Sequence, residues 1–457
     1  MRRLAGLVAV VVTALAAAPA HAALPPVKHV FVIVMENKDY AETFAQDNPK
    51  APFLAKTLPA MGALLPEYYA TGHLSLDNYI SMVSGQGPNP QTQADAPLFT
   101  DFVPATPGDD GQAMGTGTVY PASVKTIADQ LEAKGLKWRG YMEDMANGPP
   151  DQKTCRHPEP NQPDSTQSAR QGDQYAARHN PFVYFHSLTD GTSCRQNDVD
   201  FRVMPGEIAQ AGTTPAYSFI TPNLCHDGHD EPCKGSNEPG GLHSINDFLQ
   251  KWVPEIMSSN GFKDDGLLIV TFDEAESDSS ACCNEKASNT PSPGGDQPGP
   301  GGGKIGAVVI SPFIRPGTVE TTPYNHYSML RGIEDLFGLD HLGYAGQAGL
   351  EPLGPKLFNQ TPRLGLAVAA KRRDRRHVRF AVDAGRQATV SFGGVCSAPA
   401  RTASEEGKAT VTVRHARGGS CRVTVARDAW QSSIKSFKLR DPRRREFAGA
   451  ASSNGGS

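Results

Sequence analysis

Residues 28–35 read KHVFVIVM and residues 267–272 read LLIVTF, and these two apolar stretches decide the fold class. Each is short, continuous and rich in β-branched side chains, which is typical of a strand buried on both faces of a parallel sheet. A third stretch, IGAVVI at residues 305–310, has the same character. Helix-like segments lie between the strands, at residues 123–134 and 243–256. Strands that alternate with helices predict an α/β domain with a mainly parallel sheet.

Polar residues follow the first two of these strands directly. Glu36 and Asn37 come after the first strand, and Asp273 and Glu274 come after the second. Since sheets of this kind bind ligands beyond the carboxyl ends of their strands, we expect the two pairs to meet there. Three carboxylates and one amide oxygen are ligands that hard divalent cations prefer. The competing interpretation is that these residues cap the helices that follow the strands.

Residues 68–85, YYATGHLSLDNYISMVSG, resemble the HPSxPNY…SG signature of the phosphoesterase family, which contains bacterial phospholipases C and secreted acid phosphatases. That family belongs to the alkaline-phosphatase-like superfamily. Other segments that resemble the family occur in the same order, at residues 32–40, 177–185, 221–230, 271–278 and 311–339. Each segment is weak by itself, but the ordered set is specific. The resemblance covers residues 28–340, and it implies an alkaline-phosphatase-like fold with a mainly parallel sheet flanked by helices.

The resemblance implies a role for the matched polar residues. Ser75 matches a serine nucleophile that would form a phosphoserine intermediate, and Asn78 would hold a phosphate oxygen. Because a serine hydroxyl is a weak nucleophile, a divalent metal ion of unknown identity would activate it. The metal ligands would be Glu36, Asn37, Asp273, Glu274 and Asp227. The alternative for Ser75 is an ordinary helix N-cap.

Five histidines lie inside the matched segments, and an imidazole can bind metal, bind phosphate or protonate a leaving oxygen. His229 is the first candidate for assisting the leaving alcohol, because the turn HDGHD places acids and imidazoles together. His326 is the second catalytic candidate. His73, His179 and His226 are assigned to substrate binding. For each histidine the competing interpretation is a hydrogen-bonded structural residue.

The segment around the nucleophile departs from the family pattern at two positions. Leu74 stands where the family often has proline before the serine, and Asp77 replaces a second proline. Loss of both prolines predicts a less rigid loop. Asp77 also adds a negative charge near the expected phosphate site. These departures bear on substrate preference more than on the class of reaction.

The chain begins with an expected signal peptide, residues 1–22, in which two arginines precede an apolar run and a small-residue cleavage site. Ordinary export fits better than twin-arginine export, because little of the longer motif is present. Eight cysteines in an exported chain favour disulfides over a zinc site, since no CxxC pair occurs. Cys396 and Cys421 are expected to bond each other, and adjacent Cys282 and Cys283 are expected to pair with different partners.

The composition changes after residue 352, which predicts further parts of the chain. We expect a catalytic domain at 27–352, a linker at 353–376, a small antiparallel β domain at 377–440 and a disordered tail at 441–457. Within the catalytic domain, the Gly/Pro-rich segment 284–304 is expected to be a surface loop, with a mobile lid as the alternative.

Charge is distributed unevenly along the chain. Residues 360–457 hold 20 Lys and Arg against 7 Asp and Glu, whereas the whole chain carries a net charge of −4. With two positive charges in the signal peptide, the part between carries −19. The basic end suggests adhesion to an anionic envelope or membrane surface; the alternative is a solvated basic face without a partner. Nucleic acid is not expected as a partner.

The sequence therefore predicts a secreted or periplasmic, metal-assisted phosphoester hydrolase. A phosphomonoesterase of the acid phosphatase type is the leading prediction, and its substrate would be a phosphate ester. The alternative within the family is a phospholipase C that cleaves phospholipid headgroups. A third possibility, from another class, is a non-catalytic envelope-binding protein.

Overall fold

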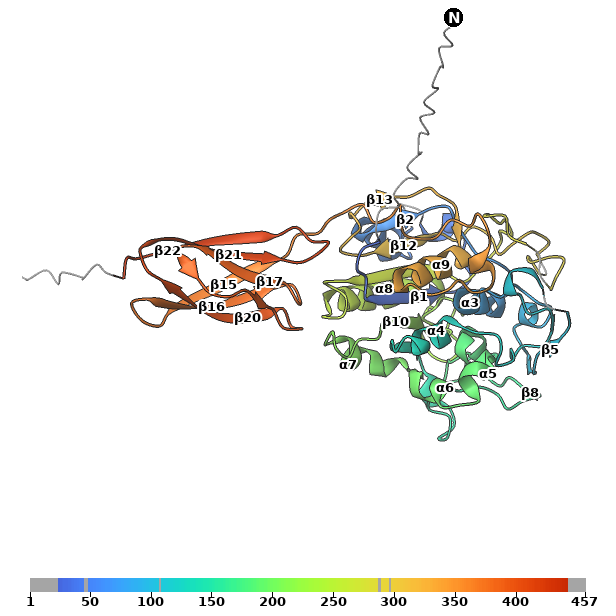
Figure 1. Cartoon of the computed structure of the whole chain (residues 1–457). Helices are drawn as coiled ribbons and strands as arrows, with labels where there is room; N and C mark the ends of the chain where they lie inside the picture. The colour runs from blue at the N-terminus through green and yellow to red at the C-terminus, as the bar shows by residue number, and fades with distance from the viewer. Residues whose placement is uncertain (1–23, 45–47, 107, 287–288, 296, 443–457) are drawn as a thin grey trace, which may run out of the picture.

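The computed structural model describes residues 24–44, 48–106, 108–286, 289–295 and 297–442 (Figure 1). A larger part with a central sheet and helices comes first, and a smaller part made of strands follows it. The expected signal peptide and residues 443–457 of the expected tail lie outside the described residues. Among the described residues, no helix combines the length and the apolar character needed to cross a bilayer.

An eight-stranded sheet forms the centre of the larger part. Across the sheet the strands are β13 (Thr318–Val319), β2 (Ala63–Leu65), β12 (Ala307–Ile310), β11 (Gly266–Phe272), β1 (His29–Met35), β10 (Tyr217–Thr221), β7 (Trp138–Met142) and β9 (Asp198–Asp200). The five strands from β11 to β9 are parallel to one another. Strand β12 runs antiparallel to both of its neighbours. The mainly parallel sheet predicted from the sequence is confirmed.

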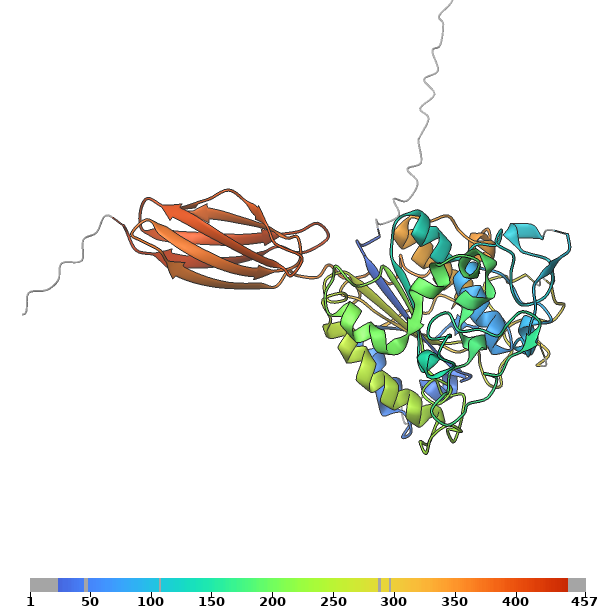
Figure 2. The same ribbon diagram turned by 90° about the horizontal axis from the view of Figure 1, so that it is seen from below.

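Helices cover both faces of this sheet, with α8 on one side and α4 and α9 on the other (Figure 2). The helices are α1 (Tyr40–Thr43), α2 (Leu58–Met61), α3 (Ser75–Ser84), α4 (Ile127–Ala133), α5 (His186–Thr189), α6 (Ser193–Asn197), α7 (Met204–Ile208), α8 (Gly241–Ser258) and α9 (His326–Phe337). Every residue of β1 and β11 is buried, which explains why these strands read as continuous apolar runs. Thr126 is the N-cap of helix α4 and forms a capping box with Asp129.

The pairing of β1 with β11 positions the two polar pairs. The two strands are parallel and in register, with Met35 opposite Phe272. Both strands end at that level, so the residues that follow them emerge side by side at the carboxyl edge of the sheet. This is the meeting point that the sequence predicted.

Short two-stranded ribbons complete the larger part. They pair β3 (Tyr68–Tyr69) with β14 (Tyr324–Asn325), β4 (Leu98–Phe99) with β8 (Gln162–Pro163), and β5 (Val103–Pro104) with β6 (Gly115–Thr116). The β3–β14 pair joins the segment before the expected nucleophile to the start of α9.

The smaller part consists of two antiparallel sheets, which confirms the predicted β domain. The first contains β15 (Leu366–Arg372), β16 (His377–Ala384), β20 (Lys408–His415) and β18 (Cys396–Ser397), and the second contains β19 (Arg401–Thr402), β17 (Thr389–Gly394), β21 (Gly419–Ala426) and β22 (Ser433–Leu439). Strand β15 lies inside the range 353–376 that was expected to be a linker. It is an edge strand whose residues are largely exposed and end in basic side chains, so no strong alternation marks it in the sequence.

Four disulfides join the eight cysteines. They are Cys155–Cys194, Cys225–Cys233, Cys282–Cys283 and Cys396–Cys421. The pairing of Cys396 with Cys421 is confirmed, and it connects the two sheets of the smaller part. The expectation that Cys282 and Cys283 have different partners was wrong. The turn at Cys283 has a positive φ of 68°, and the other six cysteines pair among themselves, which leaves these two neighbours to bond each other.

Candidate active site

The ends of β1 and β11 bring Glu36, Asn37 and Asp273 together. The backbone N–H of Asn37 donates to Asp273 Oδ1 at 3.0 Å. Asn37 has a φ of 45°, a left-handed conformation that asparagine tolerates better than most residues. This turn directs the Asn37 side chain back into the group of carboxylates instead of capping a following helix.

Ser75 lies against this group as the first residue of α3. Its hydroxyl donates to Glu36 Oε2 at 2.9 Å, and the hydroxyl of Tyr79 donates to Glu36 Oε1 at 2.6 Å. All three side chains are buried. Leu74, and not Ser75, holds the N-cap position of the helix. The Ser75 hydroxyl is therefore directed at a carboxylate rather than at the helix N–H groups.

Two residues fix the loop and helix that present Ser75. Asn78 accepts from the backbone N–H groups of Thr71 and Gly72 and donates to the carbonyls of Gly72 and Leu74. Asp95 accepts a hydrogen bond from the backbone N–H of Leu76 at 3.0 Å. It therefore caps the start of α3, although it lies 19 residues further along the chain. The Asn78 amide donates both of its hydrogens to carbonyls of this loop. The role of Asn78 in holding phosphate stays a prediction.

His179 lies between two buried carboxylates. Its Nδ1 is 3.2 Å from Asp227 Oδ2, and its Nε2 is 3.4 Å from Glu36 Oε2. The Nε2 atom has no hydrogen-bond partner among the described residues. One ligand atom each from Glu36, His179 and Asp227 lie within 4.8 Å of one another, so His179 also fits a metal ligand. The role in substrate binding that the sequence suggests for His179 stays a prediction.

His73 and His326 support the second pair of polar residues. His73 Nδ1 contacts Glu274 Oε2 very closely, and His73 Nε2 is 3.0 Å from the carbonyl of Asp278. His326 Nε2 lies 2.7 Å from the carbonyl of Asp273, and its Nδ1 lies 3.2 Å from the Tyr68 hydroxyl. Burial lowers the pKa of His326 to about 4, so its ring is neutral. These contacts favour a positioning role for His326.

His229 and His226 have different surroundings. His229 Nε2 lies 3.0 Å from Arg178 Nη2, and its Nδ1 lies 2.9 Å from Asp230 Oδ1. The arginine nitrogen must donate, so His229 Nε2 carries no proton in this arrangement. The ring centroids of His229 and His179 are 5.9 Å apart, which keeps His229 beside the site.

His226 binds two carboxylates outside this cluster. Its ring nitrogens lie 2.8 Å from Glu143 Oε2 and 3.1 Å from Glu238 Oε2. Burial disfavours the charged ring, but the two carboxylates outweigh it and raise the pKa of His226 to about 9. These contacts are those of a structural ion pair, and the predicted role in substrate binding stays a prediction.

The carboxylates strongly influence one another. Burial and the neighbouring charges of Asp273 and Asp227 raise the pKa of Glu36 well above its ordinary value. Burial and the charge of Asp273 do the same for Glu274. When all of these buried acids are ionised, their mutual repulsion and lost hydration raise the free energy of the folded chain. A divalent cation bound among them would offset that repulsion.

The Asn37 amide provides an independent test of whether these residues fit a cation. Its terminal oxygen lies 3.0 Å from Glu36 Oε2 and 3.1 and 3.2 Å from the two carboxylate oxygens of Asp273. Oxygens that approach this closely need either a rotated amide that donates hydrogen bonds or a cation between them. An all-oxygen set of two carboxylates and an amide suits a hard divalent cation, and His179 nearby also admits zinc.

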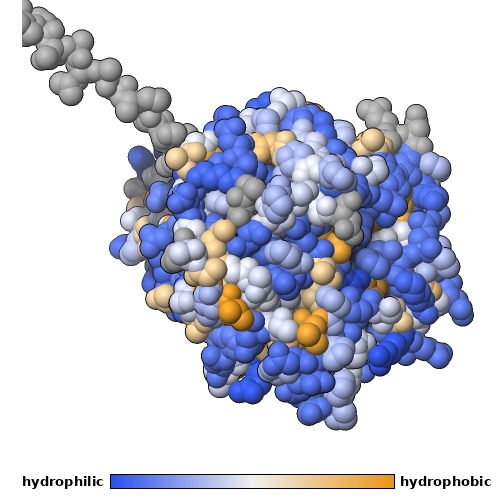
Figure 3. All heavy atoms as spheres, turned by 90° about the vertical axis from the view of Figure 1, so that its right-hand side faces the viewer, coloured by the Kyte–Doolittle hydropathy of each residue, from blue (hydrophilic) through white to orange (hydrophobic). Residues whose placement is uncertain are grey.

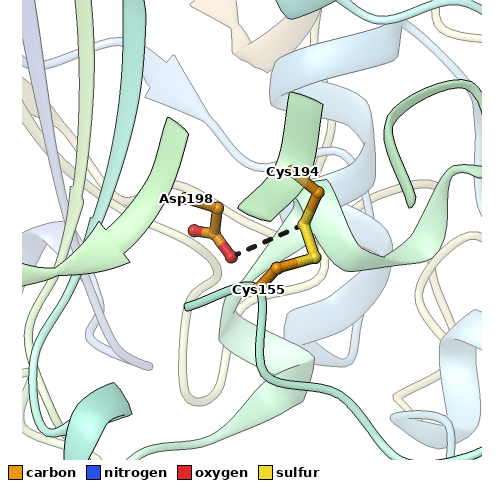
Figure 4. A group of neighbouring side chains, drawn as sticks. All are labelled: Cys155, Cys194 and Asp198. Atoms are coloured by element: carbon orange, nitrogen blue, oxygen red, sulfur yellow. Dashed lines mark hydrogen bonds between the residues drawn. A yellow bond between two sulfur atoms is a disulfide. The ribbon is translucent and has the colours of Figure 1, made fainter. Parts of the chain in front are cut away.

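Two other groups of potential ligands do not fit a metal. Cys155, Cys194 and Asp198 lie together (Figure 4), and Cys225 lies beside His226 and Glu238. The cysteines in both groups form disulfides, so they offer no thiolate. Burial raises the pKa of Asp198 to about 8, and this carboxyl accepts a hydrogen bond from Asn180 at 2.7 Å.

Asp77, the departure from the family pattern, lies against the loop that precedes Ser75. A Cβ atom on Gly72 would lie 2.7 Å from both Asp77 carboxylate oxygens, so Asp77 packs beneath that glycine. Burial first, and then the charges of Glu274, Asp95 and Asp273, raise its pKa well above the ordinary value. The expectation that Asp77 adds negative charge near the phosphate site stays a prediction.

The Gly/Pro-rich segment covers the loop before Ser75. The carbonyl of Pro293 accepts from the backbone N–H of His73 at 3.1 Å. A Cβ atom on Gly302 would lie 2.0 Å from the carbonyl of Gly72, so only glycine permits this close approach. Beside the loop lies a cavity of about 120 Å³ whose lining includes Asn37, His73 and Glu274. The described residues of the segment thus form a packed cover of the site.

Three contributors to the site were missed in the sequence: Tyr79, Asp95 and Arg178. Buried Arg178 lies 3.5 Å from Asp95 Oδ2 and also contacts His229, so it links the helix cap to the histidine turn. Tyr79 and Arg178 both lie inside matched segments, one turn from Ser75 and next to His179. Asp95 lies in a region without a motif, and only tertiary structure brings it to α3.

Fold and site together define an α/β protein with a serine hydroxyl beside a buried cluster of carboxylate and amide groups. The chain belongs to the phosphoesterase family, whose family model matches residues 47–340.

Individual relatives of the chain have limited identity to it. An acid phosphatase from Aspergillus fumigatus is 26% identical over 316 residues, which are 68% of this chain and 55% of the relative. The chain thus spans little more than half the length of that enzyme. A phosphatidylinositol-3-phosphatase from Mycobacterium tuberculosis is 25% identical over 329 residues, which are 72% of this chain and 83% of the relative.

A solved structure described as a protein in the alkaline phosphatase superfamily from Vibrio parahaemolyticus is also similar. It has 13% sequence identity and a TM-score of 0.41, covering 91% of this chain and 83% of that one. A similarity of this size adds nothing to the family assignment.

Proposed function

We propose that the protein is an exported, metal-assisted phosphomonoesterase that acts through a phosphoserine intermediate on Ser75. The observation that carries the proposal is the hydrogen bond from the Ser75 hydroxyl to Glu36 Oε2, inside the buried cluster that Asn37 and Asp273 complete. Membership of the phosphoesterase family and the names of the acid phosphatase relatives support the reaction class. The four disulfides support a secreted or periplasmic location.

In the proposed first step, Ser75 Oγ forms a bond to phosphorus while the bond from phosphorus to the leaving alcohol oxygen breaks. The proton of Ser75 moves to Glu36 Oε2, which already accepts its hydrogen bond, and passes from there to the leaving oxygen, which departs as the free alcohol.

In the second step, the oxygen of water forms a bond to phosphorus while the bond from phosphorus to Ser75 Oγ breaks. One proton of the water passes through Glu36 to Ser75 Oγ, so Ser75 regains its hydroxyl and inorganic phosphate leaves.

A divalent cation would be held by Glu36, Asn37 and Asp273, with Glu274 and Asp227 adjacent, and would stabilise the negative charge that develops on oxygen. Tyr79 holds Glu36 in place from its other oxygen. His326 fixes the backbone at Asp273, and His73 fixes the side chain of Glu274. The roles proposed for His229 and Asn78 at the leaving oxygen and the phosphate stay predictions.

Two observations favour a phosphomonoester over an intact phospholipid as the substrate. The cavity beside Asn37 and Glu274 holds about 120 Å³, well below the roughly 300–1,000 Å³ of pockets that enclose drug-sized ligands. The face opposite the smaller part is mostly hydrophilic, with hydrophobic residues in small separate groups (Figure 3). A surface that inserts into lipid presents a larger continuous apolar patch. Phospholipase C remains the alternative within the family.

A substrate panel with and without chelator tests the proposal. We expect phosphate release from a small aryl phosphate, loss of at least about 90% of this activity with EDTA, and recovery with one of Ca²⁺, Mg²⁺, Mn²⁺ or Zn²⁺. The panel includes a bis-aryl phosphodiester and phosphatidylcholine vesicles. Release of diacylglycerol without phosphate release would favour phospholipase C. No hydrolysis with any metal would favour a non-catalytic envelope-binding protein.

We also propose that residues 27–352 form the catalytic unit and that the strands that follow form a separate domain. The hydrophobic core of the smaller part is distinct from that of the larger part, with Trp430 packing against both.

A further inference from the structure

The smaller part has two poles, and one of them is densely cationic. This distal pole consists of the turn between β15 and β16 and the turn between β20 and β21, with the adjoining strand ends. Its exposed arginines are Arg372, Arg373, Arg375, Arg376, Arg414 and Arg417. Two aspartates, Asp374 and Asp441, lie at the same pole. Six guanidinium groups against two carboxylates give this pole a large excess of positive charge.

Backbone contacts hold the two arginine-bearing turns side by side. The N–H of His415 donates to the carbonyl of Arg376 at 2.9 Å, and His377 is the register partner of Arg414. A Cβ atom on Gly418 would lie 2.7 Å from the backbone nitrogen of Asp441, which brings the end of β22 to the same place. The side chain of Asp374 is occupied by His377 at 2.9 Å. The arginines therefore form one surface and not two separate groups.

The opposite pole of the smaller part contacts the larger part. Arg386 pairs closely with Asp265, and its Nε lies 3.5 Å from Asp264 Oδ2. Arg427 pairs with the same two aspartates at 3.3 and 3.5 Å. Asp265 is 1% exposed and Arg386 is 7% exposed. Buried ion pairs demand well-defined geometry, so this cluster sets the orientation of the two parts.

Trp430 adds an apolar contact to this junction. Its ring packs edge-on against Phe313 with ring centroids 5.9 Å apart. An apolar contact beside the ion pairs resists bending at the junction, and the smaller part extends away from the larger part in both views (Figures 1 and 2).

The distal pole and the candidate active site lie at opposite ends of the molecule. Asp265 directly precedes β11, and Asp273 directly follows it, so the seven residues of this strand separate the junction from the site. The eight residues of β16 separate the junction from the distal pole. At about 3.3 Å per residue, the two strands laid end to end span on the order of 50 Å.

We propose that the distal pole binds the surface of an anionic lipid bilayer and that the fixed junction holds the active site facing away from that bilayer. The second clause rests on the proposed function, whereas the first does not. Guanidinium groups bind phosphate through paired hydrogen bonds, and here six of them stand exposed on two adjacent turns at one end of the domain. Such an end fits an extended layer of phosphate headgroups. The two turns carry no aromatic side chain on which nucleic-acid bases would stack.

Co-sedimentation of the full chain with vesicles tests the docking. We expect binding to vesicles that contain phosphatidylglycerol, loss of binding at high salt, and no binding to pure phosphatidylcholine. The variant Arg372→Ser, Arg373→Ser, Arg375→Ser and Arg376→Ser should bind at least about a hundredfold more weakly at low salt. The matched control replaces four exposed cations of the larger part, Lys125, Arg195, Lys251 and Lys263, with serine and should bind like the parent chain.

Hydrogen exchange of the vesicle-bound chain tests the orientation without relying on activity. Amides at residues 372–377 should exchange more slowly on vesicles, whereas amides around Glu276 and Gln297, at the mouth of the candidate site, should not change. Equal protection of both regions would overturn the orientation.

Other outcomes would overturn the docking. Equal vesicle binding by the two quadruple variants would remove the role of the distal pole. Binding to soluble polyphosphate but not to vesicles would identify a free polyanion as the partner. Salt-sensitive dimers in sedimentation, lost in the arginine variant, would instead show that the distal pole binds the acidic part of a second copy.

An activity measurement then links the docking to the proposed function. Bound and free enzyme should hydrolyse a soluble aryl phosphate at the same rate, and the arginine variant should cleave phosphate from a lipid monoester in the vesicle as fast as the parent chain does. Faster cleavage of the lipid monoester by the parent chain would overturn the orientation. Absence of all hydrolysis would contradict the proposed function and leave the exchange and binding results to decide the docking.

Discussion

At the scale of single residues, Glu36 connects the buried cluster of carboxylates to the expected nucleophile. One of its oxygens accepts from Ser75 and the other from Tyr79. Although Glu36 accepts two hydrogen bonds from hydroxyl groups, its ionised form is buried beside other acids and is therefore unfavourable in free energy. A cation or a proton at the site would remove this repulsion. The geometry is that of a group prepared to receive the Ser75 proton.

Ser75→Ala should lower turnover of an aryl phosphate by at least about a thousandfold, because no nucleophile would remain. Thermal unfolding should be nearly unchanged. Ser84→Ala, in the same helix, is the control, since its hydroxyl donates to the carbonyl of Ile80 and accepts from the backbone N–H of Gln86, and neither residue belongs to the site. Retained turnover in the Ser75 variant would rule out the phosphoserine route.

Tyr79→Phe should lower kcat about ten- to a hundredfold, because Glu36 loses a hydrogen bond to a charged group. KM for an aryl phosphate should change little, and the phenylalanine ring should still stack on His179, whose ring lies 5.3 Å away. Steady-state kinetics would measure kcat and KM separately. A change confined to KM would place Tyr79 with the substrate instead.

His226 should make the fold less stable as the pH rises above neutrality. The pKa of its ring is about 9 in the folded chain and about 6.5 in the unfolded chain. The ion pairs with Glu143 and Glu238 therefore stabilise the fold fully below pH 6.5, and this contribution is lost as the pH rises to 9. His226→Gln should lower the free energy of unfolding by about 1–2 kcal/mol at pH 6 and by much less at pH 9.5. Equal losses at both pH values, measured by urea denaturation, would contradict the assignment.

At the scale of secondary-structure elements, helix α3 depends on a residue outside it. Leu74 at the N-cap position provides no side-chain hydrogen bond, and the Asp95 carboxylate caps Leu76 instead. Asp95 also neutralises part of the charge of buried Arg178. The cap thus couples the position of Ser75 to the turn that carries His229.

Asp95→Ala should lower the free energy of unfolding by about 1–2 kcal/mol and should also lower kcat, because the start of α3 loses its cap. Asp95→Asn keeps an oxygen acceptor and should recover most of kcat. Urea denaturation and steady-state kinetics on both variants would measure this. A loss of stability without any difference in kcat between the two variants would show that Asp95 supports only the fold.

Strands β1 and β11 were predictable because burial on both faces leaves an unbroken apolar run in each. Helix α4 was predictable from its periodicity, and Thr126 and Asp129 refine its start. Strand β15 was not, because an exposed edge strand needs no apolar alternation. Glu36 and Asp273 were predictable as a pair from strand ends, but the positions of Asp95 and Arg178 depend on loops that the sequence pattern does not specify.

At the scale of the whole molecule, the two parts meet through the buried cluster of Arg386, Arg427, Asp264 and Asp265. This junction lies one strand length from the candidate site, so it should affect stability without affecting chemistry. The sequence indicated the opposite charges of the two parts, but the direction of the basic end relative to the site follows from the junction alone.

Arg386→Ala should weaken the junction by about 3–5 kcal/mol, because Asp265 would keep a buried and partly unpaired charge. Calorimetry should show the two parts unfolding at separate temperatures. Turnover of an aryl phosphate should not change. Arg379→Ala, an exposed arginine on strand β16, which precedes the turn that carries Arg386, is the control. A large loss of turnover in the Arg386 variant would show that the junction and the site are coupled.

The sequence by itself determined the α/β class, the two strand ends that carry Glu36 and Asp273, the family and the basic end of the chain. These features are local, since burial, periodicity and charge leave their marks in neighbouring residues. Only the tertiary structure decided that Ser75 donates to Glu36, that Asp77 packs beneath Gly72, that Cys282 bonds Cys283, and that the distal pole and the site lie at opposite ends. Each of these depends on contacts between segments distant in sequence, or on the direction in which a side chain leaves its backbone, and neither is encoded in a local pattern.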